Sequence, residues 1–252
     1  MYDHNQQMLK YGFYYTKFFF SDRKNETLVT GPCTLLSHYK TLTKEVIKER
    51  QTKRDSYPYT SVKALVEGLD ENITVLPELK AAADVLQDYA PHNDSVGDHT
   101  KKVVEEMKKR DYYKSASDDL KNVLLLGAFL HDIGKGPASK WTEGKMKSAY
   151  PDHPADAIPM LGRILTEDIE TLSNDDIRRL CMLVVYHDII GECYEKGRDK
   201  QQIADLIESK DDYDMLAAIS IADATAVNGF WGRRIGRGAV SMKAEVMKLK
   251  NG

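Results

Sequence analysis

The sequence is poor in cysteine and has no long apolar run. Its 252 residues include three cysteines, Cys33, Cys181 and Cys193, and no Cys-x-x-Cys pair. This odd count excludes a disulfide framework and indicates reduced thiols. The longest apolar stretches, such as residues 123–130, are far shorter than the roughly 20 residues that a membrane helix needs. The sequence therefore predicts neither a disulfide-rich secreted protein nor a membrane channel.

The chain also lacks a strong excess of either charge. It has 36 Lys and Arg against 39 Asp and Glu, a formal net charge of −3. Such a balance indicates neither nucleic acid nor an acidic membrane surface as a partner. Residues 1–5 lack the basic-then-apolar order of a signal peptide, so we expect a cytoplasmic protein. With 42% apolar and 30% charged residues, the composition is typical of a globular protein and excludes a disordered chain or a collagen.

Residues 1–32 are unusual in their aromatic content. Residues 11–20 alone include Tyr11, Phe13, Tyr14, Tyr15, Phe18, Phe19 and Phe20. This run fits either a hairpin of residues 11–20 with 26–31 or a helix, because a short apolar run does not show its period. The aromatic side chains would either pack onto the main body or form a patch for nucleic-acid bases or a partner.

Hydrophobic periodicity predicts an all-α chain. Apolar residues at steps of three and four predict a long helix over residues 34–54, and two further helical stretches run to about residue 89. From residue 95 onward one helical pattern follows another, with no convincing strand alternation. We therefore expect an N-terminal, mainly helical extension over residues 1–92 and a helical bundle over residues 93–252.

Several histidines and aspartates stand where a buried polar site would place them. His99 shares one helix face with Val103 and Met107, which turns its imidazole toward the core. A core histidine satisfied by a hydrogen bond is the alternative interpretation. His153 stands just before a proline, which suits the first turn of a helix. Alone it would be a surface loop residue, but beside the other histidines it is a candidate metal ligand.

Two adjacent His-Asp pairs each end an apolar helical run. His131 and Asp132 follow residues 120–130, and His187 and Asp188 follow a second apolar run. Burying such a pair without a partner is costly. The carbonyl end of a helix also carries partial negative charge, which favours a nearby cation.

Asp223 interrupts an apolar helix face formed by Leu216, Ile219 and Val227. A carboxylate on that face needs a cation or several hydrogen-bond donors. The position therefore predicts either a metal ligand or a structural salt bridge.

Four imidazoles and two carboxylates on helices match the needs of a two-metal site. The candidate ligands are His99, His131, Asp132, His153, His187 and Asp223. This mixture suits Mn²⁺, Fe²⁺, Co²⁺ or Zn²⁺, with Mg²⁺ as a further candidate, and Asp132 can bridge two ions through its two oxygens. Such ions, about 3.5–4 Å apart, hold a hydroxide and clamp a phosphoryl group. No glycine-rich phosphate loop, dinucleotide fingerprint or nucleophile elbow competes with this interpretation.

The ordered series His, His-Asp, distant Asp resembles that of the HD superfamily of metal-dependent phosphohydrolases. Residues 97–100, 125–136 and 221–224 carry the resemblance, which covers about residues 95–235. It implies an HD-domain helical bundle in which His99, His131, Asp132 and Asp223 hold the first metal. By the same resemblance, His153 and His187 are the two further histidines found in members with two metals.

Within the superfamily, the motifs are most similar to the HD domain of bacterial uridylyltransferase/uridylyl-removing enzymes. The similarity lies in residues 98–100, in residues 131–136 and in Asp223 with the nearby Trp231. The chain departs from those enzymes because it shows no nucleotidyltransferase signature and no regulatory amino-acid-binding domains. It also has His187 followed by Asp188 where many two-metal members carry His-His, so both residues stay open as the ligand there.

Lys135 and three arginines are candidates for binding the substrate. By resemblance, Lys135 binds the phosphate or donates a proton, next to Asp132 at the catalytic centre. Arg233, Arg234 and Arg237 follow Asp223 closely enough to reach a phosphate, which arginine contacts in bidentate fashion. The alternative for this basic run is a solvated helix face.

The resemblance implies hydrolysis of a phosphomonoester or phosphodiester by a metal-activated hydroxide. The substrate would be a small-molecule phosphate ester, a nucleotide or nucleotidyl compound by family habit. Two other classes stay open at this point. One is an HD-fold di-iron oxygenase acting on a small polyol or phosphonate, and the other is a non-catalytic metal- or nucleotide-binding module.

Overall fold

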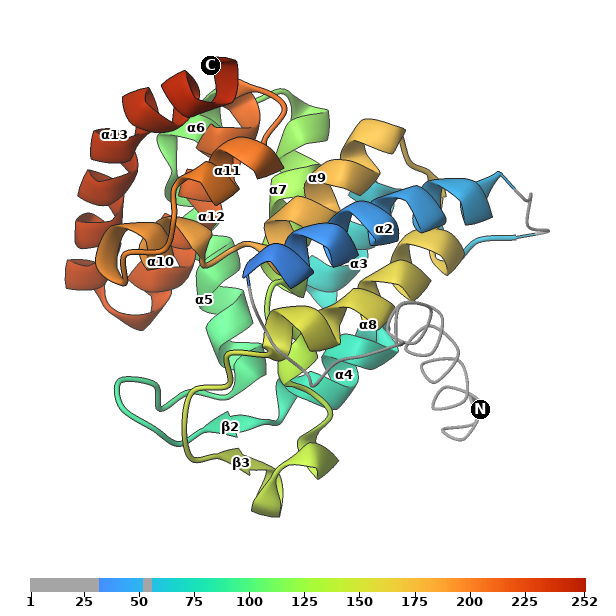
Figure 1. Ribbon diagram of the computed structural model, residues 1–252. Helices are drawn as coiled ribbons and strands as arrows, with labels where there is room; N and C mark the ends of the chain where they lie inside the picture. Colours follow the sequence, from blue (N-terminus) through green and yellow to red (C-terminus); the bar gives the residue numbers. More distant parts are fainter. Residues whose placement is uncertain (1–31, 52–55) are drawn as a thin grey trace, which may run out of the picture.

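The computed structural model describes residues 32–51 and 56–252, and α-helices dominate this part of the chain (Figure 1). The helices are α2 (Pro32–Arg50), α3 (Val62–Glu71), α4 (Pro77–Ala83), α5 (Val96–Lys109), α6 (Asp111–Ser115), α7 (Asp118–Leu130), α8 (His153–Glu167), α9 (Asn174–Val185), α10 (Ile189–Glu195), α11 (Gln201–Leu206), α12 (Lys210–Val227) and α13 (Gly229–Asn251). The predicted all-α class is confirmed. The aromatic run of residues 11–20 lies outside the described residues.

Short strands and 3-10 turns connect the helices. They are β1 (Tyr59–Ser61), β2 (Leu86–Gln87), β3 (Lys145–Met146), β4 (Ile169–Thr171), η1 (Ile73–Val75), η2 (Ile133–Lys135), η3 (Ala138–Lys140) and η4 (Thr142–Gly144). β1 pairs with β4 and β2 pairs with β3, both in parallel. The sequence did not predict these strands, because two or three residues are too few to show a period-two alternation.

Serine residues mark where several helices begin. Ser95 accepts a hydrogen bond from the backbone N–H of Asp98 and so sets the first turn of α5, which contains His99. Ser209 and Asp212 form a capping box at the start of α12, the helix that carries Asp223. These caps fix the start, and hence the rotation, of two helices that supply the site.

Most buried apolar residues of the described part of the chain form one large core. α7 and α9 lie inside it, and from Val123 to Leu130 every residue of α7 is buried. A small second cluster consists of Ala82, Val85, Val96 and Met146. Figure 1 shows α2 lying across α8 and α9, with which it packs. The buried Arg163 of α8 pairs with Glu78 of α4 and with Asp168. Helices α2, α3 and α4 therefore pack onto the same body as the later helices.

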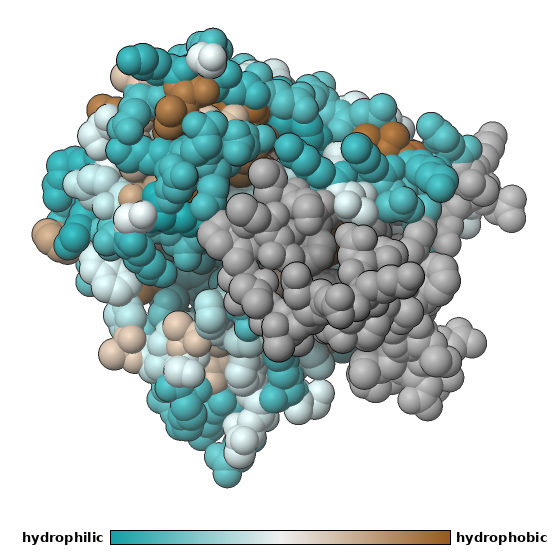
Figure 2. Space-filling view, viewed as in Figure 1, coloured by the Kyte–Doolittle hydropathy of each residue, from teal (hydrophilic) through white to brown (hydrophobic). Residues whose placement is uncertain are grey.

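Within residues 32–51 and 56–252, no helix has both the length and the hydropathy needed to cross a bilayer. Figure 2 shows one face of the molecule, on which the surface of the described residues is mainly hydrophilic with small apolar patches.

Candidate metal centre

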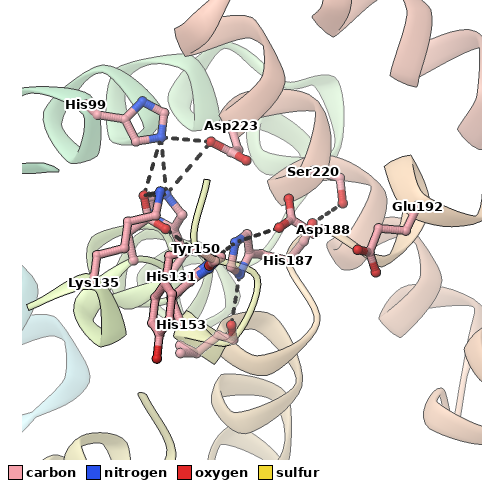
Figure 3. Close-up of polar contacts among 12 residues, drawn as sticks. His99, His131, Lys135, Tyr150, His153, His187, Asp188, Glu192, Ser220 and Asp223 are labelled. Carbon is pink, nitrogen blue, oxygen red and sulfur yellow. Dashed lines mark hydrogen bonds and ion pairs between the residues drawn. The ribbon is translucent and has the colours of Figure 1, made fainter. Parts of the chain in front are cut away.

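The six predicted metal ligands meet in one place, and each comes from a helix end or its following turn. His99 lies in the first turns of α5, His131 and Asp132 follow α7, and His153 begins α8. His187 follows α9, and Asp223 lies in the last turns of α12. Figure 3 shows the four histidines and Asp223 pointing toward one another from different elements. The four histidines and Asp132 are at most 6% exposed, so the polar groups must satisfy one another or a ligand.

Two glycines allow the elements that carry the ligands to approach closely. A Cβ at Gly134 would lie 1.9 Å from the carbonyl oxygen of His153, so the turn after Asp132 can press on the start of α8 only with glycine there. A Cβ at Gly127 would lie 2.8 Å from Leu183 Cδ1, where α7 crosses α9. These contacts bring the two His-Asp turns toward the same point.

Three overlapping groups of possible ligand atoms are present among the described residues, and the third consists of His187, Asp188 and Asp223. In the first, His99 Nε2 lies 2.8 Å from Asp223 Oδ1 and 3.4 Å from His131 Nε2. In the second, His153 Nε2 lies 3.1 Å from His187 Nε2. Within each group, one ligand atom per residue lies within 4.8 Å of the others.

Asp132 joins the first two groups through its two carboxylate oxygens. Its Oδ2 lies 3.2 Å from His131 Nε2 in the first group. Its Oδ1 lies 3.3 Å from His153 Nε2 in the second, and this buried oxygen receives no hydrogen bond from the described residues. A carboxylate with one oxygen toward each group is placed to bridge two cations.

Hydrogen bonds to the backbone decide which imidazole nitrogen faces the site. The Nδ1–H groups of His131, His153 and His187 donate to carbonyl oxygens three residues earlier, at 2.8, 2.6 and 2.9 Å. A carbonyl only accepts, so Nδ1 carries the proton and the Nε2 lone pair points inward. This is the arrangement that metal-bound histidines use.

The donor set fits divalent metal ions. Two bare nitrogen lone pairs at 3.1 Å repel each other unless a cation lies between them. Nitrogens bound at about 2.1 Å to one ion come this close to each other. The residues present can therefore hold metal at both groups.

The histidine pKa values at the site shift in both directions, because burial would lower the pKa of His187 but Asp188 and Asp132 raise it above its ordinary value. Burial lowers the pKa of His153 to about 4, which keeps its Nε2 free of a proton at neutral pH. Burial would raise the pKa of Asp132, but His131 and Lys135 hold it well below its ordinary value. Burial would also raise the pKa of Asp223, but His99 lowers it below its ordinary value. Neutral imidazoles and ionised carboxylates are the forms that bind metal.

The candidate centre opens into a cavity of about 920 Å³, a size typical of small-molecule sites. Asp132, His153, His187 and Asp223 line one side. The aromatic rings of Tyr89, His92, Tyr150 and Trp231, from other segments, also line the cavity. Apart from the motif match of Trp231, sequence reasoning missed these residues. They stand in loops or at a helix start and have no local pattern that marks a cavity wall.

Lys135 lies next to Asp132, as the resemblance implies, and its side chain lines the cavity. Its Nζ donates to Asp132 Oδ2 at 2.7 Å and to Gln87 Oε1 at 2.9 Å. Burial would lower the pKa of Lys135, but the carboxylate of Asp132 raises it above the ordinary value. The side chain therefore presents a buried positive charge to the cavity.

The three predicted arginines do not line the cavity. Arg233, Arg234 and Arg237 are exposed on α13, which instead turns Trp231 and Ile235 inward. Consecutive helix positions point about 100° apart, so closeness in sequence to Asp223 does not place a side chain in the same cavity. The placement agrees with the alternative of a solvated helix face, on which Arg234 pairs with the cavity residue Glu195 at 2.6 Å, and phosphate binding by these arginines stays a prediction.

Both residues of the open choice between His187 and Asp188 lie at the site. The His187 side chain is buried with Nε2 in the second group, and Ser220 Oγ donates to its backbone carbonyl. The Asp188 side chain is 50% exposed and lies 3.5 Å from His187 Nε2. Asp188 lines the cavity and belongs to the third group with His187 and Asp223, so both residues remain candidate ligands.

Comparisons with protein-family models, curated proteins and solved structures found no match to this chain.

Proposed function

We propose that this protein hydrolyses a phosphate ester, mono- or diester, at a two-metal site of the HD type. The observation that carries the proposal is Asp132, whose two oxygens reach two His-containing groups beside a cavity. Ions held in this way lower the pKa of a bound water and clamp the oxygens of a phosphoryl group. The motif resemblance supports a nucleotide or nucleotidyl substrate, and the cavity volume suits a small molecule.

The chain's own residues have separable roles in this proposal. His99, His131 and Asp223 hold one ion, His153 and His187 hold the other, and Asp132 bridges them. Lys135 adds a fixed positive charge at the cavity wall, where it would stabilise negative charge on the phosphoryl oxygens. The buried, free thiols of Cys181 and Cys193 support a reducing, cytoplasmic location.

The first test is elemental analysis of the full chain purified without added metal, followed by assays with Mn²⁺ or Co²⁺. We expect about two ions per chain and hydrolysis of bis(p-nitrophenyl) phosphate or p-nitrophenyl phosphate. Asp132→Ala should abolish this activity, whereas Asp175→Asn, an exposed change in the first turn of α9, should retain it.

Two results would contradict the proposal. One is full hydrolysis by Asp132→Ala. The other is no hydrolysis with any of these metals together with substrate-dependent O₂ uptake after reconstitution with iron, which would identify a di-iron oxygenase instead.

A further inference from the structure

A buried glutamine outside the predicted HD segment contacts the catalytic lysine. Gln87 is completely buried, and its Oε1 accepts hydrogen bonds from Lys135 Nζ at 2.9 Å and from Tyr89 Oη at 3.4 Å. Its Nε2 is also buried and has no hydrogen-bond partner among the described residues. A buried amide with unmade hydrogen bonds is unfavourable, so packing alone does not explain glutamine at this position.

The backbones on both sides of this contact are held in place. The N–H of Gln87 donates to Asp94 O at 3.0 Å, and β2 pairs with β3 on its other side. On the opposite side of the contact, Trp141 Nε1 donates to the carbonyl oxygen of Lys135 at 2.7 Å. The backbone positions are thus fixed, and the orientation of the flexible lysine stem is left to its side-chain partners.

Lys135 has three ammonium N–H groups, of which Asp132 and Gln87 each take one. A lysine with one acceptor can still rotate about that bond, whereas two acceptors define the direction of the third N–H. Lys135 and Asp132 line the cavity but Gln87 does not, so Gln87 acts on a bound molecule only through the lysine.

We propose that Gln87 is a positioning residue that aims the Lys135 ammonium at the phosphoryl group of the substrate. This assignment rests on the proposed phosphohydrolase function. It also makes β2, which precedes the predicted HD segment, part of the catalytic apparatus.

A double-mutant cycle in the full-length, Mn²⁺-loaded protein tests the proposal. With bis(p-nitrophenyl) phosphate, we expect Gln87→Met to lower kcat/KM about tenfold and Lys135→Met about 100-fold. The double variant should be no slower than Lys135→Met alone, because Gln87 has nothing left to position. Gln201→Met, which removes a surface hydrogen bond to Asp205 within α11, should match the wild type. Additive losses, or wild-type kinetics of Gln87→Met, would overturn the assignment.

A second readout does not depend on turnover. In a crystal structure of Gln87→Met we expect the Lys135 ammonium to be displaced or in several conformers, with unchanged metal content and unchanged His99 and Asp223. An ammonium that keeps its wild-type position would refute the positioning role. If the wild type hydrolyses no phosphate ester, the proposed function fails, and this structural comparison still decides whether Gln87 orients the lysine.

Discussion

At the scale of single residues, the site depends on a buried carboxylate that is surrounded by imidazoles and a lysine. Asp132 is 1% exposed and lies between imidazoles from three different helices, with Lys135 on its remaining side. Removing it would leave the facing nitrogens of both groups without the anion that makes cation binding favourable.

The first prediction concerns metal content. Asp132→Ala should lower bound metal from about two ions per chain to about one or none, because both coordination groups lose a ligand. Elemental analysis after dialysis measures this, with Asp175→Asn as the control that keeps its metal. A variant that still binds both ions would show that Asp132 is not the bridge.

At the scale of elements, the site depends on close contact between a turn and a helix start. η2 packs against the first turns of α8, and the Gly134 position leaves no room for a side chain at the His153 carbonyl. Moving either element by the width of a methyl group would separate His131 and Asp132 from His153.

The second prediction tests this packing. Gly134→Ala should destabilise the fold by about 1–3 kcal/mol or more and lower metal affinity, since its Cβ would overlap backbone atoms that cannot rotate away. Gly236→Ala is the matched control, because that Cβ would lie 3.8 Å from its nearest neighbour and α13 gains up to about 1 kcal/mol in helix propensity. Chemical denaturation and metal analysis of both variants check the prediction. Equal stability of the two variants would contradict the steric argument.

The third prediction concerns a buried ion pair between α9 and α12. Asp212 is completely buried and accepts bonds from Arg178 Nη1 at 2.8 Å and from the backbone N–H of Glu208 at 2.8 Å. Burial would raise the pKa of Asp212, but these bonds lower it below its ordinary value. A depressed folded pKa stabilises the protein above the unfolded pKa of about 4, and this stabilisation is lost as the pH falls below that value.

Asp212→Asn should therefore cost about 1.5–3 kcal/mol at neutral pH, because it leaves Arg178 with only the more exposed carboxylates of Asp175 and Glu208 as partners. The difference from the wild type should shrink as the pH falls below about 4. Urea unfolding at several pH values measures it. A difference that stays constant with pH would exclude the ion pair as its cause.

At the scale of the whole molecule, the candidate metal centre lies where α5, α7, α8, α9 and α12 converge. Ions bound there would link these helices and stabilise the folded state. An unfolded chain does not bring together ligands that are so far apart in sequence.

The fourth prediction is that chelation lowers the melting temperature. Metal present at about 100 times its Kd stabilises the folded state by about 2.7 kcal/mol, which corresponds to roughly 5–10 °C for a protein of this size. Calorimetry with and without EDTA measures the shift. Asp132→Ala should show a smaller response, and a wild type indifferent to the chelator would argue against resident metal.

Much of the fold and most of the candidate ligands were predictable from local patterns. His99 beside Val103 and Met107, and His131 at the end of the apolar run 123–130, are buried as their pattern predicts. The short parallel strands, the packing of α2, α3 and α4 onto the later helices and the cavity walls were not predictable. They arise from pairings between segments that are far apart in sequence.

The sequence alone determined which helices form and which polar side chains they bury, because hydrophobic periodicity and helix ends are local properties. Only the tertiary structure decided that Gln87 meets Lys135 across 48 residues, that the His187 imidazole groups with Asp132 and His153, and that Arg233, Arg234 and Arg237 face solvent. These outcomes depend on how helices rotate and approach one another, and the approach at Gly134 is one such contact between elements. Hydrogen bonds and sterics between elements distant in sequence set that geometry, and no local pattern encodes them.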